Sequence, residues 1–177
     1  MITRTFYLTV AICAAMPFAA FSQESNSNPL TAGEKGFYSM VSRNVIGGAE
    51  KMPEADYAFK PTPDVRSFGQ LVGHVADAQY MFCSAAIGET NPMKGIEKSK
   101  TTKAELVQGL KDAVAYCGKA YDMTDAQASQ TVKLFGHEMP KMTVLTINSA
   151  HTDEHYGNMV TYLRLKGIVP PTSEGKK

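Results

Sequence analysis

The sequence predicts an all-α protein, a four-helix bundle in up-down-down-up order. Four segments of about 20 residues place apolar side chains at helical spacing. Only the fragment QTVKLFG (130–136) indicates extended structure, and so short a run cannot anchor a sheet alone. A long connection between the second and third segments sets the order of the helices.

The first helix is expected over Thr31–Lys51. Thr31 is its predicted N-cap, and Glu34 follows at the spacing of a capping box, in which two side chains bond each other's backbone amides. Pro53 stops this helix, because proline cannot donate the helical hydrogen bond.

The second helix follows a loop with three prolines (53–65). It is expected to begin near Arg66 or Ser67 and to end at Ile87, where Gly88 can take the left-handed conformation of a helix end.

The third helix is expected from Thr101 or Thr102 to Tyr121, and Glu105 can close a capping box with Thr102. The segment Asp122–Pro140 then reads as a loop.

The fourth helix is expected over Pro140–Gly167, since proline suits a first turn and glycine a helix end. His137, which precedes it, is expected to be an exposed loop residue.

The connection Gly88–Thr101 is long enough to cross the bundle. Its roughly 14 residues can span about 45 Å, whereas a 20-residue helix is only about 30 Å long. The second and third helices can therefore run parallel. In that arrangement Cys83 and Cys117 lie at nearly the same level, which predicts a disulfide if the side chains face each other. The alternative is two buried free thiols.

The first 22 residues have the features of a secretory signal peptide. Arg4 is the only charge in Met1–Ser22, an apolar run follows it, and Ala20-Phe21-Ser22 resembles a cleavage site. The alternative is a membrane anchor, but Pro17 interrupts the run. We therefore expect a periplasmic or secreted protein.

The rest of the chain divides into a flexible leader (23–29), one helical bundle domain (30–171) and a disordered tail (172–177). The whole chain carries a formal charge of +1, and cleavage removes Arg4 and leaves a neutral protein. A neutral surface does not favour nucleic acid as a partner. Because no second apolar run is long enough to span a bilayer, no stable membrane anchor is expected after cleavage.

Three histidines are candidate metal ligands. His151 and His155 are four residues apart in the fourth helix and so share one face. His74, in the second helix, falls near the same level if the two helices are antiparallel. Three imidazoles leave a coordination position open, which is the layout of a catalytic metal site. The alternative is that all three are ordinary core or surface histidines.

Two carboxylates accompany these histidines. Asp77 lies one turn after His74, and Glu154 precedes His155. Either one could orient an imidazole or act as a base, or could be a solvated side chain on the flank of its helix.

A competing hypothesis is a peptidase. His151–His155 fits the inverted zincin pattern H-x-x-E-H, with Glu154 as general base. That pattern needs a downstream glutamate as third ligand, and Glu174 in the tail is a poor candidate. His74 is favoured in its place.

The runs SFGQLVGHVADAQYMFC (67–83) and SAHTDEHYGNMVTYLRLKGIVPP (149–171) resemble the DinB-like (DinB/YfiT) superfamily. The most specific parts are "GHVADA", the H-x-x-x-H pair and the closing Y-L-R-x-K-G-I-V-P-P. The resemblance implies an up-down-down-up four-helix bundle that is often dimeric. It also implies a divalent metal, zinc or nickel, held by a triad that falls on His74, His151 and His155.

The resemblance leaves the activity open. Some relatives transfer or isomerise with low-molecular-weight thiols, and others are hydrolase-like. Because such thiols are mainly cytosolic, the expected export favours a metal-dependent hydrolase acting on a small molecule. A metal-dependent thiol transferase or isomerase is the first alternative. A non-catalytic metal-binding module is the second, and the first two helices are the expected faces of a homodimer.

Overall fold

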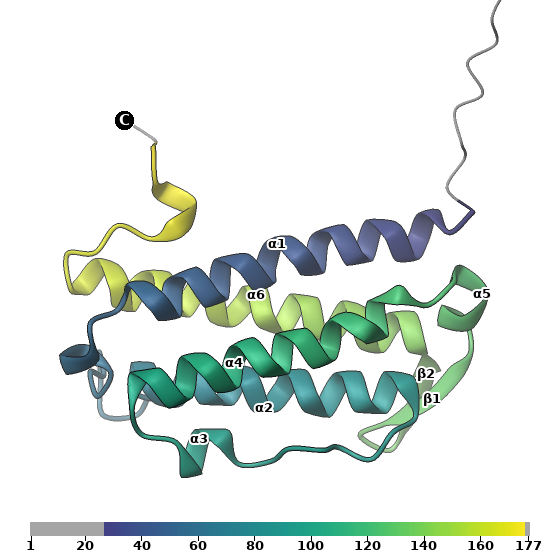
Figure 1. The fold of residues 1–177 in the computed structure, drawn as a ribbon, viewed down its shortest axis with the longest axis horizontal. Helices are drawn as coiled ribbons and strands as arrows, with labels where there is room; N and C mark the ends of the chain where they lie inside the picture. Colours follow the sequence, from purple (N-terminus) through teal and green to yellow (C-terminus); the bar gives the residue numbers. More distant parts are fainter. Residues whose placement is uncertain (1–26, 176–177) are drawn as a thin grey trace, which may run out of the picture.

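The structure, a computed structural model, describes residues 27–175 and is mostly helical (Figure 1). The signal peptide predicted for Met1–Ser22 lies outside the described residues. Among those described, no helix combines the length and apolarity needed to cross a membrane. The helices and strands are α1 (Pro29–Lys51), α2 (Phe68–Ile87), α3 (Ile96–Ser99), α4 (Lys103–Gly118), α5 (Asp125–Ala128), β1 (Thr131–Leu134), β2 (His137–Pro140) and α6 (Lys141–Leu165), with short 3-10 helices at Glu54–Asp56, Lys119–Asp122 and Pro171–Ser173.

Four long helices, α1, α2, α4 and α6, lie side by side. In Figure 1, α1 and α6 run from right to left, whereas α2 and α4 run from left to right. The segment between α2 and α4 returns along the outside of the bundle and contains the short helix α3. Each of α1 and α2 packs against both α4 and α6. The core therefore lies between these four helices, as the sequence predicts for a helical protein.

Local signals begin and end the two middle helices. Ser67 caps α2 in a capping box with Gln70, and Gly88 ends the helix at a φ of 77°. Thr102 caps α4 in the capping box predicted with Glu105. The starts of both helices and the end of α2 agree with the sequence to within a residue or two, because each depends on side chains close in sequence. α4 ends at Gly118, three residues before the predicted Tyr121, and a 3-10 helix follows over Lys119–Asp122.

The predicted cap of the first helix is wrong. α1 begins two residues earlier, at Pro29, so Thr31 lies inside its first turn. The side chain of Asp125 accepts hydrogen bonds from the Thr31 amide and hydroxyl, both at 2.8 Å. Glu34 instead bonds Ser149 of α6 at 2.6 Å. A carboxylate 94 residues away has replaced the local cap, which no sequence pattern can reveal.

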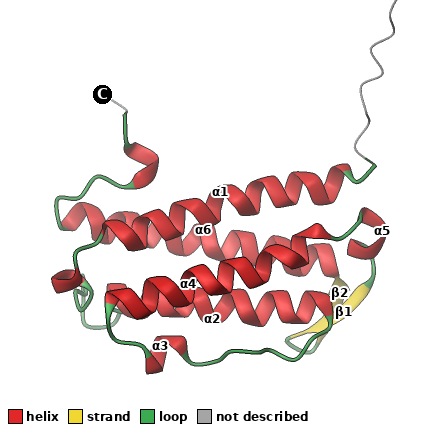
Figure 2. Ribbon diagram, viewed as in Figure 1, coloured by secondary structure: helices red, strands yellow, loops and turns green. Residues whose placement is uncertain are grey.

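The segment expected to be a loop before the last helix contains structure of its own. β1 and β2 form an antiparallel hairpin in which Leu134 pairs with His137, and α5 precedes it. Figure 2 shows the two strands at the end of the bundle where α6 begins. His137 is exposed, as expected, but it lies in β2 and not in a loop. QTVKLFG thus contains β1 and the turn, and HEMP provides the partner strand.

The expected boundaries of the leader and the tail need correction. Pro29, assigned to the leader, is the first residue of α1. The predicted disordered tail includes part of a 3-10 helix, and Thr172 exchanges hydrogen bonds with the Tyr156 hydroxyl. Glu174 forms an ion pair with Lys51. Thr172 and Glu174 therefore both have partners on the bundle, the first through its backbone amide and hydroxyl and the second through its carboxylate.

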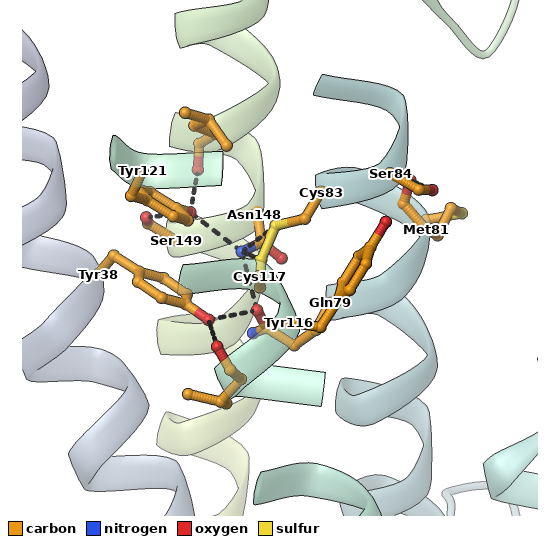
Figure 3. Close-up of a disulfide and its surroundings, with 12 residues drawn as sticks. Tyr38, Gln79, Met81, Cys83, Ser84, Tyr116, Cys117, Tyr121, Asn148 and Ser149 are labelled. Atoms are coloured by element: carbon orange, nitrogen blue, oxygen red, sulfur yellow. Dashed lines mark hydrogen bonds between the residues drawn. A yellow bond between two sulfur atoms is a disulfide. The ribbon is translucent and has the colours of Figure 1, made fainter. Parts of the chain in front are cut away.

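Cys83 and Cys117 form a disulfide that joins α2 to α4, with Cα atoms 5.2 Å apart (Figure 3). Each cysteine lies near the C-terminal end of its helix, so the two helices run in the same direction. The Asn148 amide of α6 lies 3.3 Å from the Cys117 sulfur, and it also donates to Tyr121 and Gln79 at 3.0 Å.

The inner face of α6 is partly polar. Asn148, Ser149 and Thr152 are buried, and Thr152 bonds Gln79 of α2 at 2.7 Å. Buried polar groups are tolerated when hydrogen-bonded, and this network joins α6 to α2 one turn from the histidines.

Candidate metal centre

The three histidines converge on one point between α2 and α6. His74 comes from the middle of α2, and His151 and His155 come from one face of α6. The Nε2 atom of His151 lies 3.2 Å from that of His74 and 3.1 Å from that of His155. One ligand atom from each residue lies within 4.8 Å of the other two. The structure thus brings together the histidines singled out by their spacing.

These distances suit a shared metal ion. Imidazole nitrogens bind zinc at about 2.0–2.1 Å, which places two ligands about 3.4 Å apart in tetrahedral geometry and about 3.0 Å apart at right angles. The observed separations of 3.2 and 3.1 Å fall between these values. Three neutral nitrogen donors suit zinc, nickel or copper better than calcium or magnesium. The residues present therefore fit a divalent transition metal.

The surroundings keep the imidazoles neutral. Burial, followed by the nearby His155 and His74, lowers the pKa of His151 to about 4. Burial, followed by the charges of His74 and Arg66, lowers the pKa of His155 to about 4. Burial and Arg66 also lower the pKa of His74, against an opposing effect of Glu97. Neutral imidazoles present a lone pair to a metal without first losing a proton.

The three rings differ in what their second nitrogen contacts. Nδ1 of His74 lies 3.4 Å from a carboxylate oxygen of Glu97. Nδ1 of His155 lies 3.3 Å from the side-chain amide of Asn158, and a half-turn of that amide would present an acceptor oxygen. Nδ1 of His151 is buried, and it has no hydrogen-bond partner among residues 27–175. A neutral imidazole that binds a metal through Nε2 carries its proton on Nδ1, so the partner of Nδ1 would determine how well each ring is oriented.

Neither carboxylate proposed from sequence touches the cluster. Glu154 is exposed on α6, and its charge acts on His151 only at a distance. Asp77 accepts hydrogen bonds from the backbone amides of Ile96 and Glu97, at 2.9 and 3.0 Å. Glu174 is held by Lys51, which removes it as a zincin-type ligand.

Glu97 and Arg66 are the neighbours that sequence reasoning missed. Nε of Arg66 donates to the Glu97 carboxylate at 2.9 Å, and the same carboxylate approaches His74. Both residues lie in connections, where periodicity gives no information. One weak signal exists: Gly73 lies inside a helix, where glycine often marks a close approach of another backbone.

An open cleft of about 720 Å³ reaches the cluster at His155. Its walls come from the loop before α2, the start of α2, the short helix α3 and the C-terminal half of α6, and they include Lys60, Arg66, Gln70, Glu97, His155, Asn158 and Tyr162. The Tyr162 hydroxyl donates to the Arg66 carbonyl at 2.7 Å, which ties the loop to α6. A small molecule in this cleft would reach the centre from the His155 side.

Comparisons with known proteins agree with this architecture. The sequence model of the DinB superfamily matches residues 41–159. Among curated proteins, none matches the sequence.

Several solved structures share the fold. A DinB-like protein from Bacillus cereus ATCC 10987 is similar with a TM-score of 0.71 and 16% identity, covering 79% of this chain and 95% of that one. A DinB-like protein from Bacillus subtilis is similar with a TM-score of 0.63 and 20% identity, covering 76% of this chain and 92% of that one. A mutant of a mycothiol-dependent maleylpyruvate isomerase is similar with a TM-score of 0.58 and 13% identity, covering 73% of this chain and 60% of that one. At these identities the likeness shows the fold alone.

Proposed function

This chain belongs to the DinB superfamily, and we propose that it binds a divalent metal, zinc or nickel, through His74, His151 and His155 and acts as a metal-dependent hydrolase on a small molecule. The observation that carries the proposal is the convergence of three Nε2 atoms from two helices. His74 lies 77 residues from His151, and the pairing of α2 with α6 brings them together; a shared metal ion would account for three Nε2 atoms at this spacing.

The residues around the centre suit a hydrolytic role. A divalent ion at this position supplies a Lewis acid and lowers the pKa of bound water. His74, His151 and His155 hold it and leave at least one position open, since within the described residues no fourth side chain joins the cluster. Asn158 and Arg66 line the cleft beside His155, where they can orient a substrate by hydrogen bonds. Hydrolysis needs no second substrate besides water.

A thiol-dependent transferase or isomerase is the second candidate. It is supported by the structural neighbour that is a mycothiol-dependent isomerase, of whose length this chain covers 60%. In that case the cleft would hold a low-molecular-weight thiol, and its sulfur would occupy the open position as thiolate. The proposed export of the protein, through removal of Met1–Ser22, speaks against a cytosolic thiol as co-substrate.

The third candidate is a metal-binding module without chemistry, working as a homodimer through α1 and α2. A module of this kind predicts a closed site with a fourth protein ligand. The open cleft at His155 favours an enzyme over this candidate.

Elemental analysis tests the metal site. The mature chain from Gln23, purified without a histidine tag, should carry close to one divalent ion per molecule. A His151→Ala/His155→Ala variant should lose it, because two of three ligands are gone. His137→Ala is the matched control: it removes a histidine outside the cluster and should keep the ion.

Reaction class is tested on the metal-loaded protein with esters, amides and thiol adducts. Hydrolysis that disappears in the double variant supports the hydrolase. Turnover that requires an added thiol would favour the transferase. A folded wild type that takes up no zinc, nickel or manganese would contradict the proposed function altogether.

A further inference from the structure

We infer that Glu97 is a positioning residue of the metal centre, and that the short helix α3 is docked on α2 in order to hold it there. The inference rests on the proposed function, since orienting His74 matters only if His74 binds a metal. It gives a role to the crossover segment, which otherwise only connects two helices.

The first step is the attachment of α3 to α2. The Asp77 carboxylate accepts hydrogen bonds from the Ile96 and Glu97 amides, at 2.9 and 3.0 Å. The Ile96 side chain is buried in the core. Both backbone and side chain of α3 are therefore held by the bundle, although the helix has only four residues.

The second step is the close approach at Gly73. A Cβ atom on Gly73 would lie 2.6 Å from the Glu97 Cα and 2.9 Å from its backbone nitrogen. Side chains do not approach backbone so closely, so only glycine allows α3 to lie at this depth. Gly73 precedes His74 directly, and Asp77 follows one turn later. Gly73 and Asp77, which fix the position of Glu97, thus lie on either side of His74 in the sequence.

The third step is the position of the carboxylate itself. One oxygen of Glu97 lies 3.4 Å from Nδ1 of His74, and the other accepts from Nε of Arg66 at 2.9 Å. The Nε2 atom of His74 lies on the other side of the ring and faces His151. A metal on Nε2 requires the proton on Nδ1, and a carboxylate is the strongest acceptor for that proton.

No other carboxylate in residues 27–175 forms such a pair with the cluster. The nitrogen Nδ1 of His155 faces an amide, and Nδ1 of His151 has no hydrogen-bond partner in this part of the chain. Glu97 is thus the anionic group next to the ligands, and Arg66 holds it from the cleft side. Asp77, singled out as an orienting carboxylate, hydrogen-bonds the backbone that carries Glu97 rather than His74, although its charge also raises the pKa of His74.

Zinc affinity, measured by competition with a chromophoric chelator, tests this role. Glu97→Ala should weaken binding by about 10- to 100-fold, the usual effect of removing such a partner. Glu97→Gln keeps an acceptor oxygen without the charge and should lose less. Asp153→Asn, which removes an exposed carboxylate from the same helix as two ligands, should bind like wild type.

A double-mutant cycle tests the order of action. Asp77→Ala frees α3 and should also weaken zinc binding. If Asp77 acts through Glu97, the Asp77→Ala/Glu97→Ala protein should bind no more weakly than Glu97→Ala alone. Full additivity of the two losses would overturn this part of the inference.

A spectroscopic readout separates positioning from general destabilisation. In the zinc-loaded protein, NMR of the imidazole nitrogens should show the Nδ1 proton of His74 hydrogen-bonded to an acceptor. Glu97→Ala should shift that resonance and leave the resonances of His155 in place. Unchanged affinity and an unchanged His74 resonance in Glu97→Ala would overturn the inference while leaving the metal site intact. Absence of zinc binding in wild type would instead overturn the proposed function, and this inference with it.

Discussion

Side-chain burial makes the metal-free centre sensitive to acid. The pKa values of His151 and His155 are lowered to about 4, whereas an imidazole in an unfolded chain has a pKa near 6.5. Between these values the unfolded chain binds protons that the folded chain does not. Protons therefore favour unfolding across that interval.

The metal-free protein should lose stability as the pH falls from about 6.5 to about 4. The histidine contribution is fully present above pH 6.5, because both states are then neutral. Urea unfolding in the presence of a chelator, at steps between pH 7.5 and 4, measures the change. A His151→Gln/His155→Gln variant should lose less over the same interval, since its glutamines do not titrate. Equal losses in the two proteins would show that the buried imidazoles are not the cause.

α3 can pack closely on α2 because Gly73 has a hydrogen atom in place of a side chain. Gly73→Ala places a methyl group 2.6 Å from the Glu97 backbone and should destabilise the protein by about 1–3 kcal/mol. Gly36→Ala in α1 is the control: apart from its chain neighbours and the backbone of its own helix, no atom lies within 4 Å of the added carbon, so helix propensity should stabilise the protein by about 0.5–1 kcal/mol. Urea unfolding of the two variants gives both values. Two shifts of the same sign would contradict the close packing of α3 on α2.

The disulfide between α2 and α4 closes the crossover into a loop whose two cysteines are 34 positions apart in sequence. A cross-link of that length should stabilise the fold by about 3–4 kcal/mol through the entropy of the unfolded chain. Unfolding of the mature protein with and without a reductant tests this. A Cys83→Ala/Cys117→Ala variant should show no response to the reductant. If wild type and variant behaved alike, the thiols would not be bonded in solution.

The whole bundle should respond to metal, because the ligands come from two helices that separate on unfolding. Zinc at about 1,000 times its dissociation constant adds about 4 kcal/mol to the free energy of unfolding. For a chain of this size that raises the thermal midpoint by roughly 10 °C. Calorimetry with and without a chelator measures the shift. His151→Ala/His155→Ala should show none, and a comparable shift in that variant would place the metal elsewhere.

Sequence alone predicted the parts of the molecule that local spacing determines. The pair His151 and His155 lies on one face because a helix repeats every 3.6 residues, and Thr102 caps α4 through a partner three residues away. His74 could be added to the pair because, in two antiparallel helices of known length, it falls at a similar height along the bundle axis. The helical class of the fold followed from the same periodicity.

The remaining features depend on contacts between distant segments. Asp125 replaced the predicted cap of α1 from 94 residues away. Glu97 reaches His74 because the segment between α2 and α4 packs directly on Gly73. The composition of a connecting segment does not predict the path that it takes. Thr172 is fixed by Tyr156, a contact that depends on where the chain turns after α6. Sequence patterns identified the three histidines that cluster, and only the assembled bundle identified the side chains next to them.

The position of α6 in the chain has a consequence for synthesis. It is the last long helix to leave the ribosome, yet it packs against α1 and α2 and carries two of the three clustered histidines. Until α6 has emerged, the nascent chain offers His74 alone from this cluster, and the faces of α1 and α2 that α6 covers remain open to chaperones. Under the proposed function, binding of an ion by all three histidines therefore waits for α6, and a nascent chain without α6 cannot compete for metal through this site.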